Sequence, residues 1–428
     1  MFSITRRLLA GLTALLLASG GALAQSKGAA PAAAPATQTV KIAFVDPLSG
    51  PFAAVGQNIL KHFQQAAEIV TTKQLAGPGI KFEIVPFDNK GSPQESLTVL
   101  KSIIDQGIRY VAQGNGSHVA IPLADAIAKH NERNPNQSIV FLNYAAVDPD
   151  LTNSKCNFWH FRFDANTDMK MEALTEYMKG RPEIKSVYLI NQNYSHGQQV
   201  TRVAKELLAR KRPDVKIVGE DLHPLGQVRD FAPYIAKIRA SGADTVITGN
   251  WGPDLVLLVR AARDAGLNVN FYTYYAGVIG TPTAIGPAGA DLVRQVSYWH
   301  PNIAKYPYED LYTDFKKRHK EEWYTLAAFT SMTMLAEAIK RAKSTDPLRV
   351  AYTMEGLRMP TVMGEIEMRA ADHQLQQPLF ISVWTKAGGE VKHDSENTGY
   401  GFKTVKAIDT FVGTQRTSCQ MQRPAKPQ

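Results

Sequence analysis

Short apolar runs alternate along the chain with longer stretches in which an apolar residue recurs every three or four positions. The first pair is the run at residues 41–45, rich in branched and aromatic side chains, and the stretch at residues 56–70, where the recurrence has helical spacing. Asp46 and the Pro-, Ser- and Gly-rich residues 47–51 break the pattern between them. This pattern predicts a buried strand, a turn and a helix, which is one half of a β-α-β unit.

The same cycle repeats along most of the chain. It predicts strands at residues 80–88, 108–114, 138–147, 186–192, 215–222, 243–250 and 269–275, and helices at residues 94–107, 117–133, 169–180, 197–211, 230–242 and 254–266. Helices of this length between strands imply right-handed crossovers and a mostly parallel sheet. One sheet with so many strands would be unusually wide, so we predict an α/β protein with two doubly wound parallel-sheet lobes.

The N-terminus has the pattern of a secretory signal. Arg6 and Arg7 precede an apolar run at residues 8–18, and the small residues Ala22 and Ala24 suit cleavage before Gln25. The Ala- and Pro-rich residues 25–39 have nothing to bury, so we predict a flexible linker there. No later stretch approaches the roughly 20 apolar residues of a membrane-spanning helix. The mature protein is therefore expected to be exported, and periplasmic in location.

Charge and cysteine content narrow the possible partners. The net charge of +9 includes the two arginines of the signal, and no dense basic run is interleaved with aromatic residues, so no nucleic-acid site is predicted. The two cysteines, Cys156 and Cys419, are expected to form a disulfide in an exported protein if their geometry allows it. Two free thiols are the alternative, and neither cysteine has the neighbours of a metal or redox site.

Motifs of enzymes are largely missing from the sequence. It contains no H-E-x-x-H, Walker A, C-x-x-C or strand-borne dinucleotide fingerprint, so no cofactor or metal site is predicted. Residues 114–118 are the nearest feature to a catalytic loop, because Ser117 adjoins His118 between a strand and a helix. The loop lacks the second glycine of a nucleophile elbow, however, and we predict that the protein is not an enzyme, with a hydrolase as the less favoured reading.

The turn after the first strand resembles that of a known family. Leu48, Ser49, Gly50, Pro51, Ala53 and Gly56 match the L-S/T-G-P-x-A-x-x-G pattern of the branched-chain amino-acid-binding family of periplasmic solute-binding proteins. The similarity continues in order from about Val40 to about Thr385. It implies the type I periplasmic binding protein fold and the substrate-binding role in an ABC importer. Without the resemblance, the turn could equally be an ordinary connection between a strand and a helix.

The resemblance also implies a domain organisation. In this family the chain crosses three times between the lobes and so forms a three-strand hinge, with crossings carried over here to residues 161–163, 298–301 and 360–364. The division expected is a signal peptide at residues 1–24, a linker at 25–39, lobe 1 at 40–162 with 300–362, lobe 2 at 163–299 with 363–400, and a C-terminal tail at 401–428. We expect a monomer that closes around its ligand by bending at the hinge.

The family's ligand residues carry over to loops of both lobes. Loops matching Gly116–Ser117 and residues 145–147 supply hydroxyl and N–H groups to the ligand's carboxylate in the family. Ser117, Ala145 and Ala146 suit this role, whereas Val147 replaces the family's threonine and lacks its hydroxyl. Tight strand packing is the alternative role for the two alanines.

In the second lobe, His196 and Trp251 take the places of family aromatics, with Tyr194 close by. Trp251 could stack on the ligand or cap the hinge, and His196 could donate to a carboxylate or be merely solvated.

Tyr275 is the most informative departure from the family. Amino-acid-binding members have an acidic residue at this place, which pairs with the ligand's α-ammonium, and a phenol supplies no negative charge at neutral pH. Asp254 or Asp46 could substitute for this acid. We therefore expect a small carboxylate ligand, aromatic or branched aliphatic, that lacks an α-amino group, with a branched-chain or other amino acid as the alternative.

Two functional hypotheses follow. The first is an extracytoplasmic solute-binding protein that delivers its ligand to the permease and ATPase subunits of an ABC importer. The second is a ligand-sensing module that presents the same ligand to a receptor or regulator.

Overall fold

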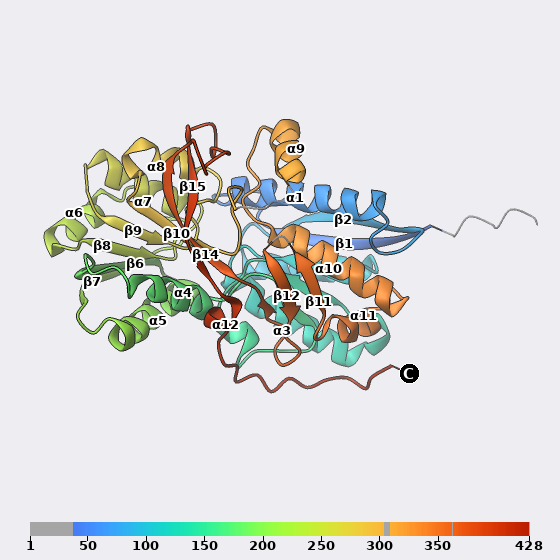
Figure 1. The fold of residues 1–428 in the computed structure, drawn as a ribbon. Coiled ribbons are helices and arrows are strands. Elements are labelled where there is room, and N and C mark those ends of the chain that lie inside the picture. Colours follow the sequence, from blue (N-terminus) through green and yellow to red (C-terminus); the bar gives the residue numbers. More distant parts are fainter. Residues whose placement is uncertain (1–36, 304–308, 362, 428) are drawn as a thin grey trace, which may run out of the picture. The chain divides into compact units, whose positions relative to one another are not determined.

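A computed structural model describes residues 37–303, 309–361 and 363–427. In these residues the strands form two large sheets and one small sheet (Figure 1). The first large sheet is parallel throughout and has the order β2-β1-β3-β4-β5; its strands are β1 (Gln38–Asp46), β2 (Ile80–Asp88), β3 (Tyr110–Gln113), β4 (Val140–Asn143) and β5 (His160–Arg162). The apolar run predicted to be a strand is the interior strand β1, which is buried from Ile42 to Asp46.

The second large sheet has the order β15-β14-β10-β9-β8-β6-β7. Its first five strands in sequence are parallel, and the last two, β14 and β15, are added antiparallel at one edge. The strands are β6 (Ser186–Gln192), β7 (Lys216–His223), β8 (Thr245–Thr248), β9 (Asn270–Thr273), β10 (Val293–Ser297), β14 (Leu379–Lys386) and β15 (Tyr400–Ile408). The two predicted parallel-sheet lobes are thus confirmed.

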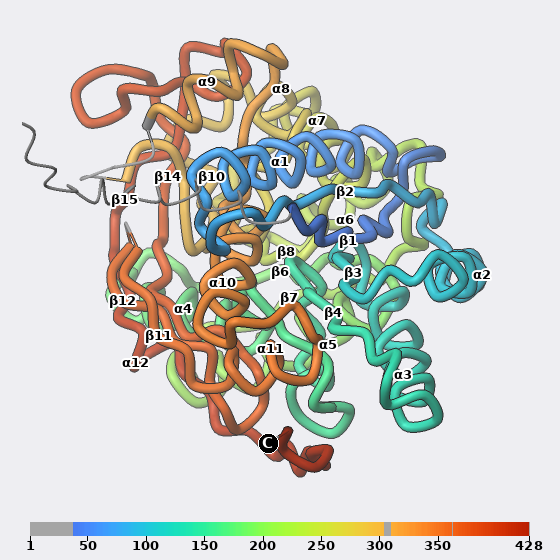
Figure 2. Tube along the Cα trace, turned by 90° about the vertical axis from the view of Figure 1, so that its right-hand side faces the viewer, coloured from blue at the N-terminus to red at the C-terminus, as the bar shows by residue number. Residues whose placement is uncertain are grey.

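Helices cover both faces of each large sheet, as expected when parallel strands are joined by right-handed crossovers. Around the first sheet, α1 (Ala53–Thr72) packs against α10 (Ala327–Ala342), which contacts α11 (Pro347–Met354), while α2 (Pro93–Asp105) packs against α3 (Ser117–Arg133) (Figure 2). Around the second sheet, α4 (Thr167–Met178) packs against α5 (Ser195–Lys211), and α7 (Pro253–Asp264) contacts both α6 (Ala232–Ser241) and α8 (Thr281–Ile285). The remaining helices are α9 (Glu309–His319), α12 (Thr410–Gly413) and single 3₁₀ turns at Pro135–Gln137, Pro149–Thr152 and Pro287–Gly289.

The chain leaves the first sheet after β5 and enters the second through α4 and β6, close to the first predicted crossing. It leaves the second sheet after β10, close to the second. The third crossing was predicted near residues 360–364, and this differs from the structure. Those residues belong to a hairpin of β11 (Arg358–Thr361) and β12 (Gly364–Met368), which pairs onward with β13 (Leu375–Gln376). The chain joins the second sheet only at β14, because the small sheet intervenes.

The last strand and the tail also lie differently from the expected division. Strand β15 begins at Tyr400, where a tail was expected, and forms an edge of the second sheet. After α12 the chain turns to the first lobe, where a disulfide joins Cys419 to Cys156 with their Cα atoms 5.7 Å apart. The proposed signal peptide lies outside the described residues, and within the described part of the chain no helix is long and apolar enough to cross a membrane.

Candidate functional site

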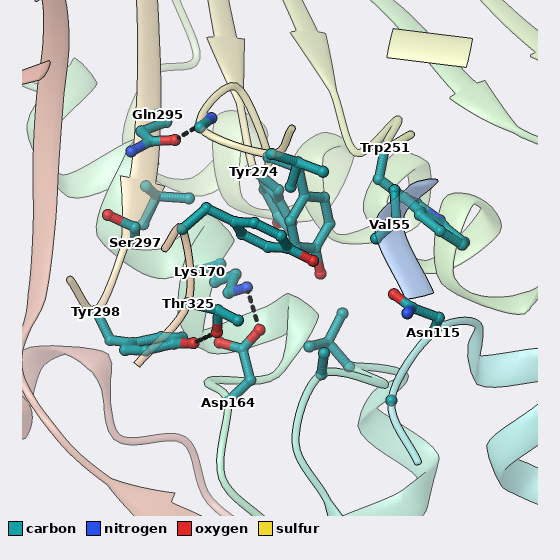
Figure 3. Close-up of a pocket in the computed structure, with 18 of the residues that line it drawn as sticks. Val55, Asn115, Asp164, Lys170, Trp251, Tyr274, Gln295, Ser297, Tyr298 and Thr325 are labelled. Atoms are coloured by element: carbon teal, nitrogen blue, oxygen red, sulfur yellow. Dashed lines mark hydrogen bonds and ion pairs between the residues drawn. The ribbon is translucent and has the colours of Figure 1, made fainter. Parts of the chain in front are cut away.

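A pocket lies where the loops at the carboxyl ends of strands from both large sheets come together (Figure 3). Parallel strands of an open α/β sheet direct such loops towards the ligand crevice. The pocket holds about 750 Å³ of space free of protein atoms, its mouth included, which suits a small molecule. Of the eight ligand residues predicted from the sequence, six line it: Ser117, Ala145, Val147, Tyr194, Trp251 and Tyr275.

Ser117 is the first residue of α3, and the glycine before it makes this position accessible. Gly116 has a φ of 94°, a conformation that favours glycine, and it brings the start of the helix to the pocket wall. The first N–H groups of a helix have no partner within the helix, and its N-terminus carries partial positive charge, so this end of the pocket suits an anion. Ser117 Oγ accepts a hydrogen bond from the N–H of Asp148 at 3.1 Å and keeps its own proton available to a ligand.

The loop after β4 contributes less to the site than expected. The N–H groups of Ala145 and Ala146 both donate to Asn143 Oδ1, at 3.2 and 2.8 Å, so the asparagine side chain occupies the donors that were assigned to a ligand carboxylate. Ala145 and Val147 line the pocket, whereas Ala146 does not. The carbonyl of Val147 accepts from both the N–H and the hydroxyl of Thr167. These short side chains shape the wall without supplying its polar contacts.

Aromatic residues of the second lobe form one wall. The indole N–H of Trp251 donates to the hydroxyl of Tyr194 at 2.8 Å, which fixes both rings at the pocket. Trp251 also packs against Phe52 from the turn after β1, with ring centroids 4.4 Å apart. Tyr275 lines the pocket, and burial raises the pKa of its phenol well above the usual value, so it is neutral.

His196 does not line the pocket. Its imidazole lies behind the wall, where Nδ1 hydrogen bonds with Thr167 Oγ1 at 2.8 Å and Nε2 faces the carbonyl of Gly249 at 3.3 Å. Burial lowers the pKa of His196 to about 3, so the ring is neutral at physiological pH. Its place in the first turn of α5 turns the ring into the protein, where it supports the loops on either side.

The two carboxylates that could substitute for an acid at position 275 both make hydrogen bonds away from the pocket. Asp46 accepts from the hydroxyl of Tyr144 and from the N–H of Asn115, and burial raises its pKa to about 7. Asp254 accepts from Gln192 Nε2 at 2.7 Å and from the N–H of Gly226 at 2.8 Å. Neither lines the pocket.

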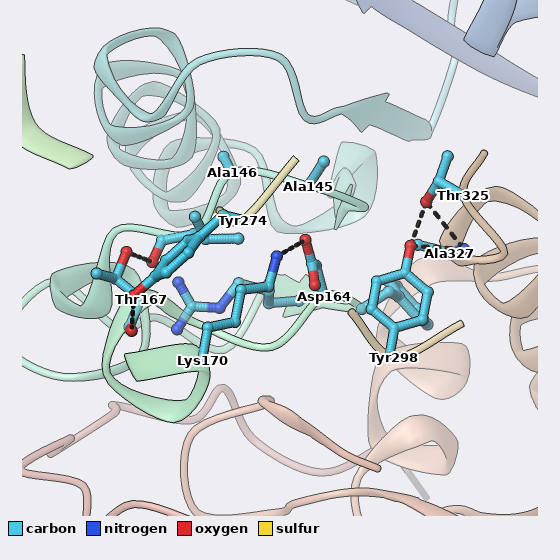
Figure 4. Close-up of polar contacts among 12 residues, drawn as sticks. Ala145, Ala146, Asp164, Thr167, Lys170, Tyr274, Tyr298, Thr325 and Ala327 are labelled. Atoms are coloured by element: carbon cyan, nitrogen blue, oxygen red, sulfur yellow. Dashed lines mark hydrogen bonds and ion pairs between the residues drawn. The ribbon is translucent and has the colours of Figure 1, made fainter. Parts of the chain in front are cut away.

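An ion pair that the sequence did not reveal lies in the pocket wall instead. Lys170 Nζ is 2.7 Å from Asp164 Oδ2, and the two side chains are only 2% and 4% exposed (Figure 4). Burial raises the pKa of Asp164 and lowers that of Lys170, while each partner counteracts the shift of the other. Asp164 and Lys170 flank the N-cap of α4, Asn166, and in the sequence they resemble the polar start of an exposed helix. The expectation of a ligand without an α-amino group assumed that no acid faces the pocket, and Asp164 removes that premise.

Residues near the hinge complete the polar wall. The hydroxyls of Tyr298 and Thr325 hydrogen bond with each other, and Gln295 Oε1 accepts from the N–H of Gly277 at 2.8 Å. The hydrolase reading of Ser117 and His118 finds no support here. His118 Nε2 hydrogen bonds with the carbonyl of Gly91, and the ring does not approach Ser117 Oγ within hydrogen-bonding distance.

Two α/β lobes with a pocket between their strand ends define a protein that binds a small molecule between lobes. The chain belongs to the periplasmic binding protein family, whose model matches residues 39–390. The Leu/Ile/Val-binding protein homolog 4 of Brucella abortus (strain 2308) is 32% identical over 405 residues, which cover 92% of this chain and 95% of that protein.

Solved structures show the same fold. The leucine-, isoleucine-, valine-, threonine- and alanine-binding protein from Brucella ovis, in a closed conformation, matches with a TM-score of 0.80 and 30% identity, covering 91% of this chain and 100% of that one. A solute-binding protein of an ABC transporter from Rhodopseudomonas palustris HaA2, in complex with p-hydroxybenzoic acid, matches with a TM-score of 0.73 and 18% identity over 87% of this chain and 98% of that one. The second likeness concerns the fold alone.

Proposed function

We propose that this protein is the extracytoplasmic solute-binding component of an ABC importer and that it captures a small carboxylate with an apolar or aromatic body. The observation that carries the proposal is the pocket itself, in which the start of α3 at Ser117 faces a wall formed by Tyr194, Trp251 and Tyr275. A helix N-terminus and a hydroxyl suit a carboxylate, and the aromatic wall suits an apolar body. The names of the relatives, which refer to leucine, isoleucine and valine, support the same class of ligand.

The proposal is tested by calorimetry on the mature protein with a panel of small carboxylates. The panel contains leucine, 4-methyl-2-oxopentanoate, 2-hydroxy-4-methylpentanoate and 4-hydroxybenzoate, with glucose as an uncharged control. At least one carboxylate should bind, and Trp251→Ala should weaken it about 10- to 100-fold because an aromatic contact is lost. Binding of glucose in place of every carboxylate would overturn the proposal.

Delivery to a permease and ATPase, rather than to a sensor, is part of the same proposal. Cross-linking in membranes of the source organism, with and without ligand, should recover a permease with its ATPase. Recovery of a receptor kinase in its place would favour the sensing alternative. His118 Nε2 hydrogen bonds with the carbonyl of Gly91 and not with Ser117, which favours binding over catalysis. An ester panel that shows turnover abolished by Ser117→Ala would contradict this part of the proposal.

A further inference from the structure

The hydrogen bonds of Lys170 are incomplete for so deeply buried a cation. An ammonium group has three N–H donors. Within the described residues Lys170 donates one hydrogen bond, to Asp164, and its other near neighbours are the rings of Tyr275 and Tyr274, whose centroids lie 4.7 and 5.8 Å from Nζ. Nζ therefore keeps two donors for a group that the protein itself does not supply.

Two other buried cations, Arg162 and Lys211, make more polar contacts than Lys170 does. Arg162 donates through Nε, Nη1 and Nη2 to Gln374, to the carbonyl of Asp148 and to Thr152. Lys211, which is also largely buried, contacts both a carboxylate oxygen and the backbone carbonyl of Glu172. Neither of these two cations lines the pocket. Lys170 thus makes fewer polar contacts than either of these two cations.

Asp164 is incomplete in the same way. Its Oδ2 accepts from Lys170, whereas its Oδ1 is buried with no hydrogen-bond partner in the described part of the chain. Buried carboxylate oxygens are normally hydrogen bonded, since water has been removed from them. An unpaired acceptor and two unpaired donors thus belong to two adjacent side chains, and both side chains line the pocket.

The pair lines the same pocket as Val147, which replaces the family's threonine. Figure 4 shows the charged ends of Lys170 and Asp164 directed towards the side on which Ala145 lies. Val147, two residues further along this loop, has no hydroxyl to offer, and the N–H groups of Ala145 and Ala146 are already used. The charged pair can supply the polar contacts that this loop lacks.

We infer that Lys170 and Asp164 together bind the head group of the ligand, with Lys170 donating to its carboxylate and Asp164 Oδ1 accepting from an N–H or O–H on the neighbouring carbon. The head group is then that of a 2-amino or 2-hydroxy carboxylic acid. This inference rests on the proposed function, since it assigns residues and a head group to the same pocket. One ligand then pairs with the free N–H donors of Lys170 and with Oδ1 of Asp164, and the ion pair between the two side chains stays intact.

The test compares ligands that differ only at the second carbon. Leucine, 2-hydroxy-4-methylpentanoate, 4-methyl-2-oxopentanoate and 4-methylpentanoate are titrated calorimetrically into the wild type, Asp164→Asn, Lys170→Met and the double variant. Leucine, the hydroxy acid or both should bind the wild type about tenfold or more tightly than 4-methylpentanoate, which has no donor. Whichever of the two binds better identifies the donor as ammonium or hydroxyl.

The variants separate the two residues. Asp164→Asn should reduce the preference over 4-methylpentanoate to within about threefold, and Lys170→Met should weaken every carboxylate about 100-fold. Lys211→Met, which removes a buried cation outside the pocket, should leave the affinities unchanged. Circular dichroism and thermal melting show which variants are folded. If a single variant does not fold, the double variant, which removes both charges of the pair, takes its place.

Two results would overturn the inference. The first is binding of 4-methylpentanoate as tightly as leucine and the hydroxy acid, and the second is unchanged affinity in folded Lys170→Met. Both results would leave the proposed function in place, because carboxylates would still bind. Failure of the wild type to bind any carboxylate would instead overturn the proposed function, and this inference with it.

Discussion

Gly56 shows how a single residue allows the turn after β1 to exist. A Cβ at this position would lie 1.9 Å from the carbonyl oxygen of Pro47, because α1 passes directly over the turn. Gly56→Ala should therefore lower the free energy of unfolding by about 1–3 kcal/mol, as expected for overpacking against backbone. Urea denaturation followed by circular dichroism measures the effect. Gly180→Ala is the matched control, since the nearest atom there is 3.8 Å away, and an equal loss in both variants would contradict the explanation.

His300 should make stability depend on pH. Burial lowers the pKa of its imidazole to about 3, from the ordinary value of 6.5, and Nε2 hydrogen bonds with Thr404 Oγ1 at 2.7 Å. As the pH falls below about 6.5, the unfolded chain binds a proton here that the folded protein does not bind, so stability is lost between that pH and about 3.

His300→Gln keeps a hydrogen-bonding side chain and removes this titration. Between pH 6 and pH 4 the free energy of unfolding of the variant should fall less steeply than that of the wild type, by up to about 1.4 kcal/mol per pH unit. Denaturant titrations at several pH values give the two slopes. Parallel slopes would show that His300 binds a proton in the folded state as well.

A site residue could be predicted from the sequence where its place in a loop after a strand was enough to bring it to the pocket. It could not be predicted where the direction of its side chain decides whether it reaches the pocket. Ser117, Trp251 and Tyr275 reach the pocket because they follow strand ends. Ala146 and His196 follow strand ends too, but one side chain is turned away within its loop and the other by the first turn of α5. No local pattern specifies those directions. Asp164 and Lys170 were missed because only the fold brings the start of α4 to the pocket.

Among whole elements, the alternation of apolar runs and helical stretches was sufficient to predict β1 to β4, β6 to β9 and the helices between them, whereas the three-residue β5 was not among the predicted strands. Each of these units is a local pattern, and the right-handed crossover fixes how successive units combine. The third crossing could not be placed in this way. It depends on β12 pairing with β11 and β13 rather than with the second sheet, and all three are short strands whose partners are set by tertiary packing.

The C-terminal tail is an element whose stabilising effect can be measured. It is attached to the first lobe by the disulfide, by Arg423 to Glu355 and by the hydroxyl of Tyr352 to the carbonyl of Pro424. The disulfide joins residues 263 positions apart, so it restricts a large part of the unfolded chain. Replacing both cysteines with serine should cost about 2–4 kcal/mol of unfolding free energy.

Urea denaturation with and without a reductant isolates the contribution of the bond. The reductant should lower the stability of the wild type to that of the double serine variant and leave the variant unchanged. An equal effect of reductant on both proteins would show that the bond itself does not stabilise the fold.

At the scale of the whole molecule, ligand binding should be coupled to closure of the lobes. Phe52 follows β1 of the first sheet and Trp251 follows β8 of the second, and their rings are in contact. Trp251 lines the pocket whereas Phe52 does not, so Phe52 can favour the closed arrangement without touching the ligand. A ligand held between the lobes binds the closed state more tightly and shifts the population towards it.

Small-angle scattering should therefore show a smaller radius of gyration for the wild type at saturating ligand. Phe52→Ala removes an aromatic contact between the lobes and should weaken binding about tenfold, equally for every ligand of the panel, because the pocket lining is unchanged. Trp251→Ala, in contrast, should alter the order of preference among the ligands as well, because its ring faces them. A radius that stays constant while calorimetry shows saturation would contradict closure, and a change in ligand preference in Phe52→Ala would show that this ring belongs to the pocket rather than to the contact between the lobes.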